Sequence, residues 1–278
     1  HSLVLAENAL AQQSRRHPHG WGIGCFDGHV PVLRRSAAAA FGDDDFDTTA
    51  RYVRSHAVVA HVRKATVGAI DKRNAHPFRF GLWLFAHNGT LKSFDDWRHK
   101  LVEAMDWDLR AEVKGSTDSE HCFYLFLSHL RRLGVDPTTR APGRVAADAL
   151  AAMVRELVAW SKAAGADPPI ANFIVSDGRC MVACRLGREL LFSTQKRFCE
   201  QMDACSRWQE EGDLSCMHPL RDAAINHILV SSEAISTEDI WEALEEGELV
   251  GIDADFGFIR EPMLAEAPGV LKALYSPF

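Results

Sequence analysis

Glycine stands at every second position of one short segment near the start of this 278-residue sequence, Gly20-Trp21-Gly22-Ile23-Gly24. Successive side chains of a β-strand point to opposite faces, so this spacing leaves one face of a strand bare. Glycine weakens a strand, and a bare face is typical of a place that another part of the structure approaches closely. The apolar pattern continues to Phe26. Asp27-Gly28, followed by the apolar residues 30–33, then predicts a hairpin to a second strand.

Strands and helices follow in runs along the rest of the chain. Further strands are predicted at residues 58–61, 82–86, 172–176, 181–185, 189–193, 228–231 and 249–252, and the three between 172 and 193 are expected to form a meander. Apolar residues at helical spacing predict helices over residues 1–13, 94–105, 119–133 and 146–160. Thr117 and Glu120 are typical of a capping box before the third helix, which Gly134 would end. Because strands and helices do not alternate regularly, we expect an α+β fold of layered, largely antiparallel sheets.

Composition and charge exclude several classes of protein. The 278 residues are enough for one large domain or two small ones, and the 47% of apolar residues can form a buried core. We expect a single domain over residues 1–278. The net charge of -7 argues against a nucleic-acid partner or an anionic membrane surface. The sequence has no apolar run near the ~20 residues that span a bilayer. Seven scattered cysteines are typical of a reducing compartment, so we expect a cytoplasmic protein.

Four residues at the ends of predicted elements form a chemically consistent set. Arg63 closes a strand, Asn88-Gly89 follows another strand, and Asp118 lies in the first turn of a capped helix. Arg63 can hold a carboxylate through two hydrogen bonds, and Asp118 can hold an ammonium group. The side-chain N–H of Asn88 and the backbone N–H of Gly89 are the usual donors of an oxyanion hole. A ligand with an α-carboxylate, an α-amine and a side-chain amide would use all four residues.

Each of these residues also has a plainer interpretation. An arginine at a strand end is usually a surface charge, Asn-Gly is most often a turn, and an aspartate behind a helix cap usually complements the helix dipole. The histidines at positions 61, 76 and 87 are more often core residues than ligands. A metal site would need converging carboxylates or cysteines, which the spacing does not predict, so no metal or other cofactor is expected. Only the joint, ordered occurrence of the motifs favours a site.

Four motifs follow one another in the first half of the chain: Arg-x-Ala-Thr at residues 63–66, Asn-Ala-His-Pro at 74–77, His-Asn-Gly at 87–89 and Thr-Asp-Ser-Glu at 117–120. In this order they resemble the glutaminase domain of class II glutamine amidotransferases, which are N-terminal-nucleophile hydrolases. The resemblance implies a four-layer αββα sandwich of antiparallel sheets. The later strands are similar to those of the compact, stand-alone members of the family.

The resemblance also assigns roles to the motif residues. Arg63 and Asp118 would bind the α-carboxylate and α-amine of glutamine, and Asn88 with Gly89 would form the oxyanion hole. Other residues would shape the pocket or line it beside the nucleophile: Thr66, His76 and the strand of residues 20–24, with Trp21 at the aromatic position found in relatives.

Two features depart from the family's pattern. His19 precedes the Gly-Trp-Gly run where relatives usually have an acidic or amide residue. The family's nucleophile is a cysteine at the mature N-terminus, whose own α-amine is the base, whereas this chain begins His1-Ser2-Leu3. Relatives carry a similar His-Ser-Leu on the helix after the first strand. We therefore expect that strand and its cysteine upstream of residue 1, and we interpret the seven cysteines of the chain as core or surface residues.

The expected activity is hydrolysis of glutamine or a γ-glutamyl amide through a cysteinyl thioester, which releases ammonia or an amine and glutamate. The chain could pass ammonia to a synthase subunit, or act alone on a γ-glutamyl compound like relatives in ergothioneine synthesis or glutathione breakdown. The sequence after Ser193 is too short for a synthase domain, which favours a stand-alone enzyme or a separate partner subunit. The alternative is a non-catalytic member that binds a γ-glutamyl ligand or a partner protein.

Overall fold

A six-stranded antiparallel sheet lies at the centre of the computed structural model, which describes residues 3–65, 68–199, 203, 217 and 225–264. The spatial order of its strands is β12-β11-β7-β6-β5-β4. Their bounds are β4 Phe78–Phe80, β5 Trp83–Thr90, β6 Ile170–Ser176, β7 Met181–Cys184, β11 Glu248–Ile252 and β12 Phe258–Pro262.

Two smaller antiparallel sheets pack beside the central one. The first has the order β2-β1-β3, with β1 Trp21–Asp27, β2 Val30–Ser36 and β3 Val58–Val62. The second has the order β10-β8-β9, with β8 Leu191–Ser193, β9 Leu229–Ser231 and β10 Glu242–Ala243. The β1–β2 hairpin around Gly28 is therefore confirmed.

The meander predicted for residues 172–193 is wrong in its last strand. β6 pairs with β7, but β8 leaves this sheet and pairs with β9 and β10. The side chain of Asn172 explains the departure, because it holds the loop after β7: its oxygen accepts from the backbone N–H of Leu186, and its nitrogen donates to the carbonyls of Arg188 and Glu189.

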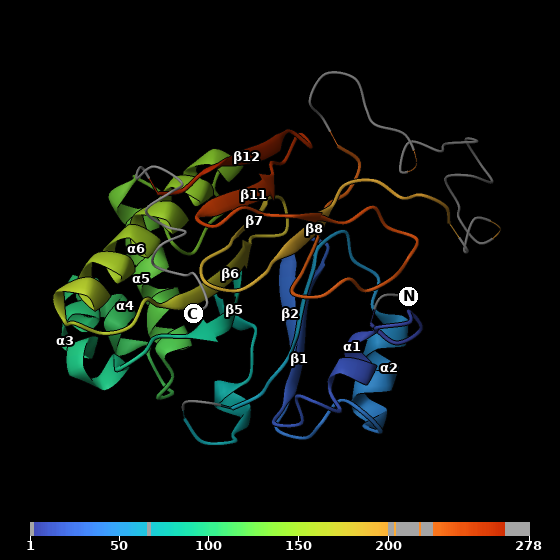
Figure 1. Cartoon of the computed structure of the whole chain (residues 1–278), viewed down its shortest axis with the longest axis horizontal. Helices are drawn as coiled ribbons and strands as arrows, with labels where there is room; N and C mark the ends of the chain where they lie inside the picture. Colours follow the sequence, from blue (N-terminus) through green and yellow to red (C-terminus); the bar gives the residue numbers. More distant parts are fainter. Residues whose placement is uncertain (1–2, 66–67, 200–202, 204–216, 218–224, 265–278) are drawn as a thin grey trace.

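Helices cover both outer faces, so the layers are helix, sheet, sheet and helix, as expected for an αββα sandwich (Figure 1). One layer contains α3 Phe94–Ala104, α4 Trp107–Ala111, α5 Asp118–Arg132 and α6 Gly143–Ala163; the other contains α1 Leu10–Gln13 and α2 Asp44–Tyr52. A short 3-10 turn, η1, spans Lys72–Asn74. The helix predicted from residue 1 is thus too long. Asn8 instead bonds through its backbone and side chain to residues 233–235, which holds the segment before α1 outside the helix.

Helix α5 is buried from Asp118 to Leu130 between the central sheet and its neighbouring helices. Thr117 caps its first turn by accepting from the backbone N–H of Glu120, as predicted. The second half of the capping box is wrong, because the Glu120 carboxylate accepts from Lys114 and Gly115 rather than from the cap residue. This contact ties the preceding loop to α5 and so fixes the position of Asp118.

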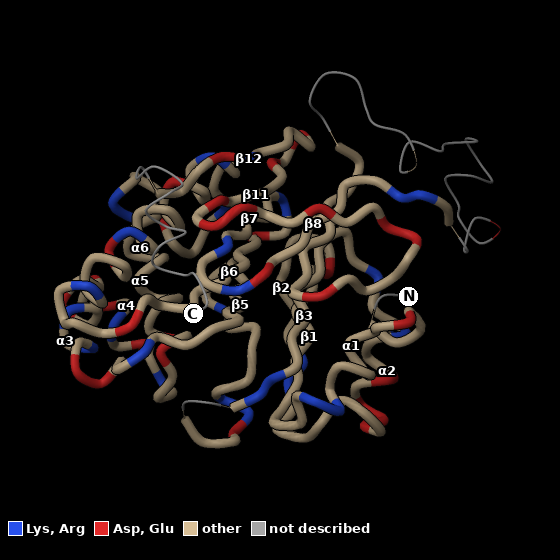
Figure 2. Tube along the Cα trace, viewed as in Figure 1, with Lys and Arg blue, Asp and Glu red and all other residues tan. Residues whose placement is uncertain are grey.

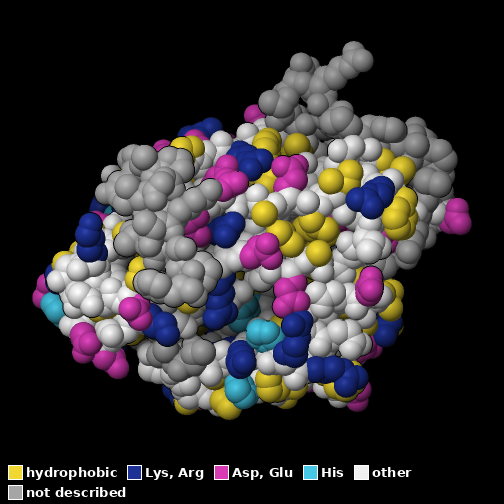
Figure 3. All heavy atoms as spheres, in the orientation of Figure 1, with side chains coloured by type: hydrophobic (Ala, Val, Ile, Leu, Met, Phe, Trp, Pro, Cys, Tyr) yellow, Lys and Arg dark blue, Asp and Glu magenta, His cyan; other side chains and the backbone are white. Residues whose placement is uncertain are grey.

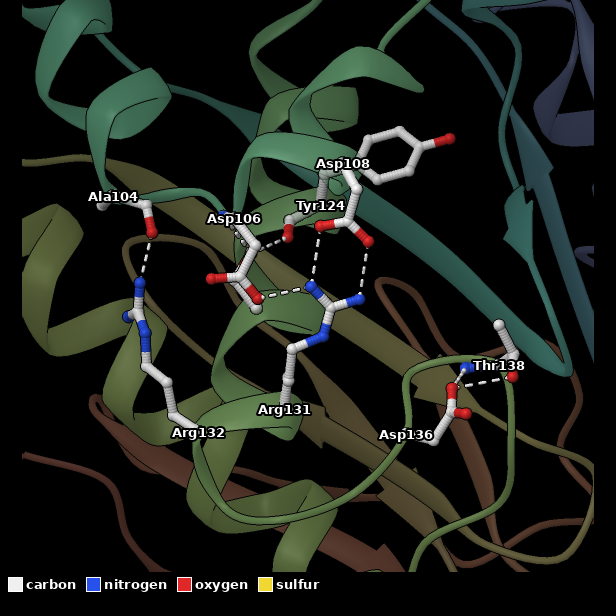
Figure 4. A network of polar contacts seen from close by, with 9 residues as sticks. Ala104, Asp106, Asp108, Tyr124, Arg131, Arg132, Asp136 and Thr138 are labelled. Atoms are coloured by element: carbon white, nitrogen blue, oxygen red, sulfur yellow. Dashed lines mark hydrogen bonds and ion pairs between the residues drawn. The ribbon is translucent and has the colours of Figure 1, made fainter.

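An ion-pair network joins α4 to α5 on the outer surface (Figure 4). Arg131 donates to both carboxylate oxygens of Asp108 at 2.8 Å and to Asp106 at 2.9 Å. These hydrogen bonds lower the pKa of Asp108 to about 2 and raise the pKa of Arg131. The network is largely solvent-exposed, so its contribution to stability is modest.

The bare face of β1 meets β5 of the central sheet and the segment that precedes β4, which is the close approach expected from the alternating glycines. A Cβ atom at Gly22 would collide with the carbonyl oxygen of His76, and one at Gly24 would lie 2.8 Å from Leu84 and 2.9 Å from Pro77. The two sheets therefore pack closely here, and the approaching group is the protein's own chain.

The charged residues lie mostly on the helices and loops, whereas β1 and β3 run through the centre almost without charge (Figure 2). On the face drawn in Figure 3, histidine and basic side chains gather below the centre of the molecule. Among the described residues, no helix is both long enough and apolar enough to cross a membrane.

Candidate active site

A cavity of about 1070 Å³ lies between the sheets. All five residues of β3 line it, together with the end of β5, parts of β6 and β9, and the start of α5. Five of the seven residues that the sequence assigned to a site line this one cavity: Arg63, His76, Asn88, Gly89 and Asp118. Thr66 lies outside the described residues.

Trp21 is not among the residues that line the cavity. Its indole packs edge-on against Phe46 of α2 at 5.2 Å, and its Nε1 donates to Asp43 at 2.8 Å. The reason is the strand alternation itself: Trp21 and Ile23 point to the outer helices, while the intervening glycines face the central sheet. The glycine strand likewise packs beside the site and is not among the residues that line it.

Asn88 and Gly89 lie inside β5 rather than in a turn after it, opposite Asn172 and Ala171 of β6. The Asn88 amide nitrogen donates to the hydroxyl of Ser232 at 2.7 Å. Its oxygen receives a longer contact, 3.4 Å, from the guanidinium of Arg188. An amide nitrogen has two N–H bonds, so the bond to Ser232 leaves one for a ligand oxygen.

Close packing of β5 against β6 requires glycine at position 89. A Cβ atom there would collide with the carbonyl oxygen of Ile170, and it would lie 2.5 Å from Nε2 of His87. Substitution would therefore disturb the pairing of β5 with β6 as well as any ligand at the site.

Asp118 links the start of α5 to the end of β5. One carboxylate oxygen accepts from the backbone N–H of Leu91 at 2.8 Å, and the other accepts from the backbone N–H of Ser119 at 2.8 Å. The side chain is almost fully buried yet lines the cavity. These bonds hold a negative charge at one fixed place in the cavity wall.

Arg63 provides a positive charge in the same cavity. It follows β3 directly and is 5% exposed, and its Nη1 donates to the carbonyl oxygen of Ala69 at 3.0 Å. Burial lowers the pKa of Arg63, and the nearby carboxylate of Asp118 opposes that shift. The cavity thus contains two buried charges of opposite sign near the Asn88 amide.

Three histidines surround these charges. His87 has Nε2 3.0 Å from the carbonyl oxygen of Ile170, so this nitrogen carries the proton and Nδ1 accepts from Ser119. His61 and His76 approach each other at 3.4 Å, and His61 Nδ1 and His76 Nε2 are buried without a hydrogen-bond partner among the described residues. Burial lowers the pKa of His61 to about 3 and the pKa of His76 well below its usual value. Both rings are therefore neutral at neutral pH.

Two edge strands flank the cavity. In the described part of the chain, β3 pairs only with β1, and β9 pairs only with β8. Both strands line the cavity, and much of the surrounding wall is apolar, including Ile174 of β6. Unpaired strand edges present backbone N–H and C=O groups that an additional strand can bond.

The described cysteines do not line this cavity. Three are buried in the core, where burial raises the pKa of each thiol: Cys122, Cys180 and Cys184. Cys25 and Cys199 are partly exposed elsewhere, and Cys205 and Cys216 lie outside the described residues.

Ser232 and Arg188 were not predicted from the sequence. They reach Asn88 from 144 and 100 residues further along the chain. Neither belongs to a local motif, and only the pairing of β6 with β5 and the exit of β8 from the central sheet bring them to the cavity.

The four layers form an αββα sandwich, and the cavity between its sheets contains the charged and amide side chains described above. Residues 3–257 match the glutamine amidotransferases class-II family, and the chain belongs to this family.

Curated relatives align with part of this chain. A probable glutamine amidotransferase of Saccharomyces cerevisiae is 34% identical over 163 residues, which is 56% of this chain and 46% of the relative. A gamma-glutamyl-hercynylcysteine sulfoxide hydrolase of Mycobacterium tuberculosis is 46% identical over 101 residues, which is 32% of this chain and 43% of the relative. The chain thus spans less than half the length of each of these two proteins.

Solved structures share the fold. A class-II glutamine aminotransferase domain protein from Silicibacter pomeroyi superposes with a TM-score of 0.62 at 24% identity, covering 88% of this chain and 91% of that one. Glutamine phosphoribosylpyrophosphate amidotransferase from B. subtilis superposes with a TM-score of 0.59 at 17% identity, covering 92% of this chain and 46% of that one.

Proposed function

We propose that the cavity binds glutamine or a γ-glutamyl amide and that the natural protein hydrolyses it to glutamate and ammonia or an amine. The observation that carries the proposal is the placement of Arg63, Asp118 and Asn88 in one cavity. A cation, an anion and an amide donor match the α-carboxylate, the α-ammonium and the scissile carbonyl of such a ligand. The relatives named as a glutamine amidotransferase and a gamma-glutamyl hydrolase support the same class of substrate.

The proposed nucleophile is a cysteine at the start of the mature chain, on an extended segment that precedes residue 1. The edges of β3 and β9, which are unpaired among the described residues and both line the cavity, support this proposal, since an extended segment could bond to such edges and cover the apolar wall. The segment would join the two small sheets into one and bring its first residue to the Asn88 end of the cavity.

The proposed reaction has two steps. The α-amine, with a pKa of about 8, takes the proton of the thiol, and the sulfur attacks the amide carbon. Asn88 and Gly89 bond the negative oxygen that forms, the carbon–nitrogen bond breaks, and the leaving amine takes the proton from the α-ammonium. Water, deprotonated by the α-amine, then hydrolyses the thioester to glutamate and restores the thiol.

Turnover and labelling of the natural gene product test this function. We expect glutamate release from glutamine or a γ-glutamyl amide, and loss of activity when a glutamine-like diazo ketone attaches to an N-terminal cysteine, as located by mass spectrometry. Label on one of the seven cysteines of residues 1–278 would contradict the proposed nucleophile. Binding of the ligand without any turnover would favour the non-catalytic alternative.

A further inference from the structure

Arg188 lies on the rim of the cavity beside the proposed oxyanion hole. Its guanidinium is 3.4 Å from the side-chain oxygen of Asn88, and the residue is exposed. Its positive charge also acts on the buried His87. Burial is the main cause that lowers the pKa of His87, and the charge of Arg188 adds a smaller lowering effect. The residue is thus a cation close to the point where the scissile amide would lie.

The backbone of Arg188 is held firmly although its side chain is exposed. Its carbonyl oxygen accepts from the amide of Asn172 at 3.1 Å and from Nε of Arg185 at 3.1 Å. Asn172 lies directly opposite Asn88 in the β5–β6 pair. The backbone of Arg188 is therefore tied to β6, at the residue directly opposite Asn88.

The guanidinium of Arg188 has no carboxylate within ion-pair distance among the described residues. The other charged groups nearby are mostly occupied: Glu233 on the cavity wall accepts from Arg16 at 2.7 Å, and Asp118 accepts from two backbone N–H groups. A guanidinium with spare donors at a cavity rim is suited to an anionic group of the ligand.

We infer that Arg188 binds a carboxylate on the leaving amine, so that the preferred substrates are γ-glutamyl amino acids or peptides rather than glutamine itself. The inference rests on the proposed function. The glutamyl part has its own partners in Arg63 and Asp118, and its carbonyl lies at Asn88. Arg188 contacts Asn88 from the β7–β8 loop, so an amine that leaves a carbonyl bound at Asn88 would depart close to this guanidinium.

A matched pair of substrates tests the inference on the natural gene product. γ-Glutamyl-glycine and γ-glutamyl-glycinamide differ only in the carboxylate of the leaving amine. We expect kcat/KM to favour γ-glutamyl-glycine about tenfold, the range of one charge-assisted hydrogen bond at an exposed site. The preference should shrink as the salt concentration rises, because ions screen an exposed pair.

Variants assign the preference to this residue. Arg188→Met should remove the preference by slowing γ-glutamyl-glycine alone, and Arg188→Lys should retain part of it. Arg179→Met is the control, since Arg179 is exposed in the β6–β7 turn and does not line the cavity. Equal rates for both substrates in the unaltered enzyme, or an equal loss on both in Arg188→Met, would overturn the inference and leave the proposed function standing. Absence of turnover of both substrates and of glutamine would overturn the inference together with the proposed hydrolytic function.

Discussion

The amide nitrogen of Asn88 and the hydroxyl of Ser232 share a 2.7 Å hydrogen bond, which joins β5 of the central sheet to the residue directly after β9. Arg188 approaches the other end of the same amide, and donors can approach only its oxygen. Together the two contacts fix which end of the Asn88 side chain is the nitrogen. The second N–H bond of Asn88, which Ser232 does not use, is therefore held in place before any ligand arrives.

The first prediction concerns that N–H bond. Asn88→Ala should lower kcat for a γ-glutamyl substrate by about 10²–10³ and change KM little, because an oxyanion donor acts mainly in the transition state. Steady-state kinetics of the natural enzyme and the variant measure both constants. Full turnover by Asn88→Ala would remove this residue from the oxyanion hole.

Ser232 is expected to act only through Asn88. Ser232→Ala should lower kcat by about tenfold or less, the value of one neutral hydrogen bond. In the double variant with Asn88→Ala, the loss of Ser232 should have no further effect, since its partner is gone. Additive losses in kcat would show that Ser232 has a role independent of the amide.

Arg63 and Asp118 are expected to affect substrate binding. Arg63→Lys keeps the charge but loses the planar pair of donors, so KM should rise more than kcat falls. Asp118→Asn should also raise KM, and it should lower the melting temperature, because an amide cannot accept from both Leu91 and Ser119 with its two ends. An unchanged KM in both variants would separate these residues from the substrate.

The histidine pair in the cavity predicts a loss of stability in acid. His61 and His76 have folded-state pKa values below that of the unfolded chain, about 6.5, so the unfolded state binds more protons at lower pH. The contribution of His61 is complete above about pH 6.5 and is lost as the pH falls toward 3, and the contribution of His76 is lost in the same direction. The charged or titratable groups that affect His61 are His87, His17 and Arg63, and all of them lower its pKa.

Urea unfolding at several pH values tests this dependence. The free energy of unfolding of the natural protein should fall between pH 6.5 and 4, and His61→Gln should reduce that slope by up to about 1 kcal/mol per pH unit. Identical slopes in the two proteins would mean that His61 titrates normally in the folded state.

The ion pair of Arg131 and Asp108 on the outer surface predicts a second loss of stability in acid, at lower pH. The pKa of Asp108 is about 2 in the folded protein, below the usual aspartate value, so its stabilising effect is present above about pH 4 and is lost as the pH falls toward 2. Arg131→Met should return the pKa of Asp108 toward the ordinary value. Carboxyl chemical shifts recorded as a function of pH measure it, and an unchanged value would contradict the role of the ion pair.

Local sequence patterns predicted those elements whose structure depends on neighbouring residues in the chain. The β1–β2 hairpin follows from its turn and its alternating residues, and the start of α5 follows from the Thr117 cap. The motif residues Arg63, Asn88, Gly89 and Asp118 reach one cavity as their order suggested.

Long-range contacts decided the features that the sequence did not predict. Asn8 bonds to residues 233–235 and so prevents the expected long first helix, and Asn172 holds the loop that directs β8 into another sheet. Ser232 and Arg188 reach the site only because of this routing. Trp21 illustrates a different limit: the pattern located the strand correctly, but which face met which layer depended on the packing of α2.

The most direct test of the central claim is a crystal structure of the natural gene product with glutamate bound. We predict that the α-carboxylate contacts Arg63, the α-ammonium contacts Asp118, and one γ-carboxylate oxygen lies within hydrogen-bond distance of the Asn88 amide nitrogen. Glutamate bound elsewhere, or bound in this cavity without contact to Arg63 and Asp118, would contradict the account.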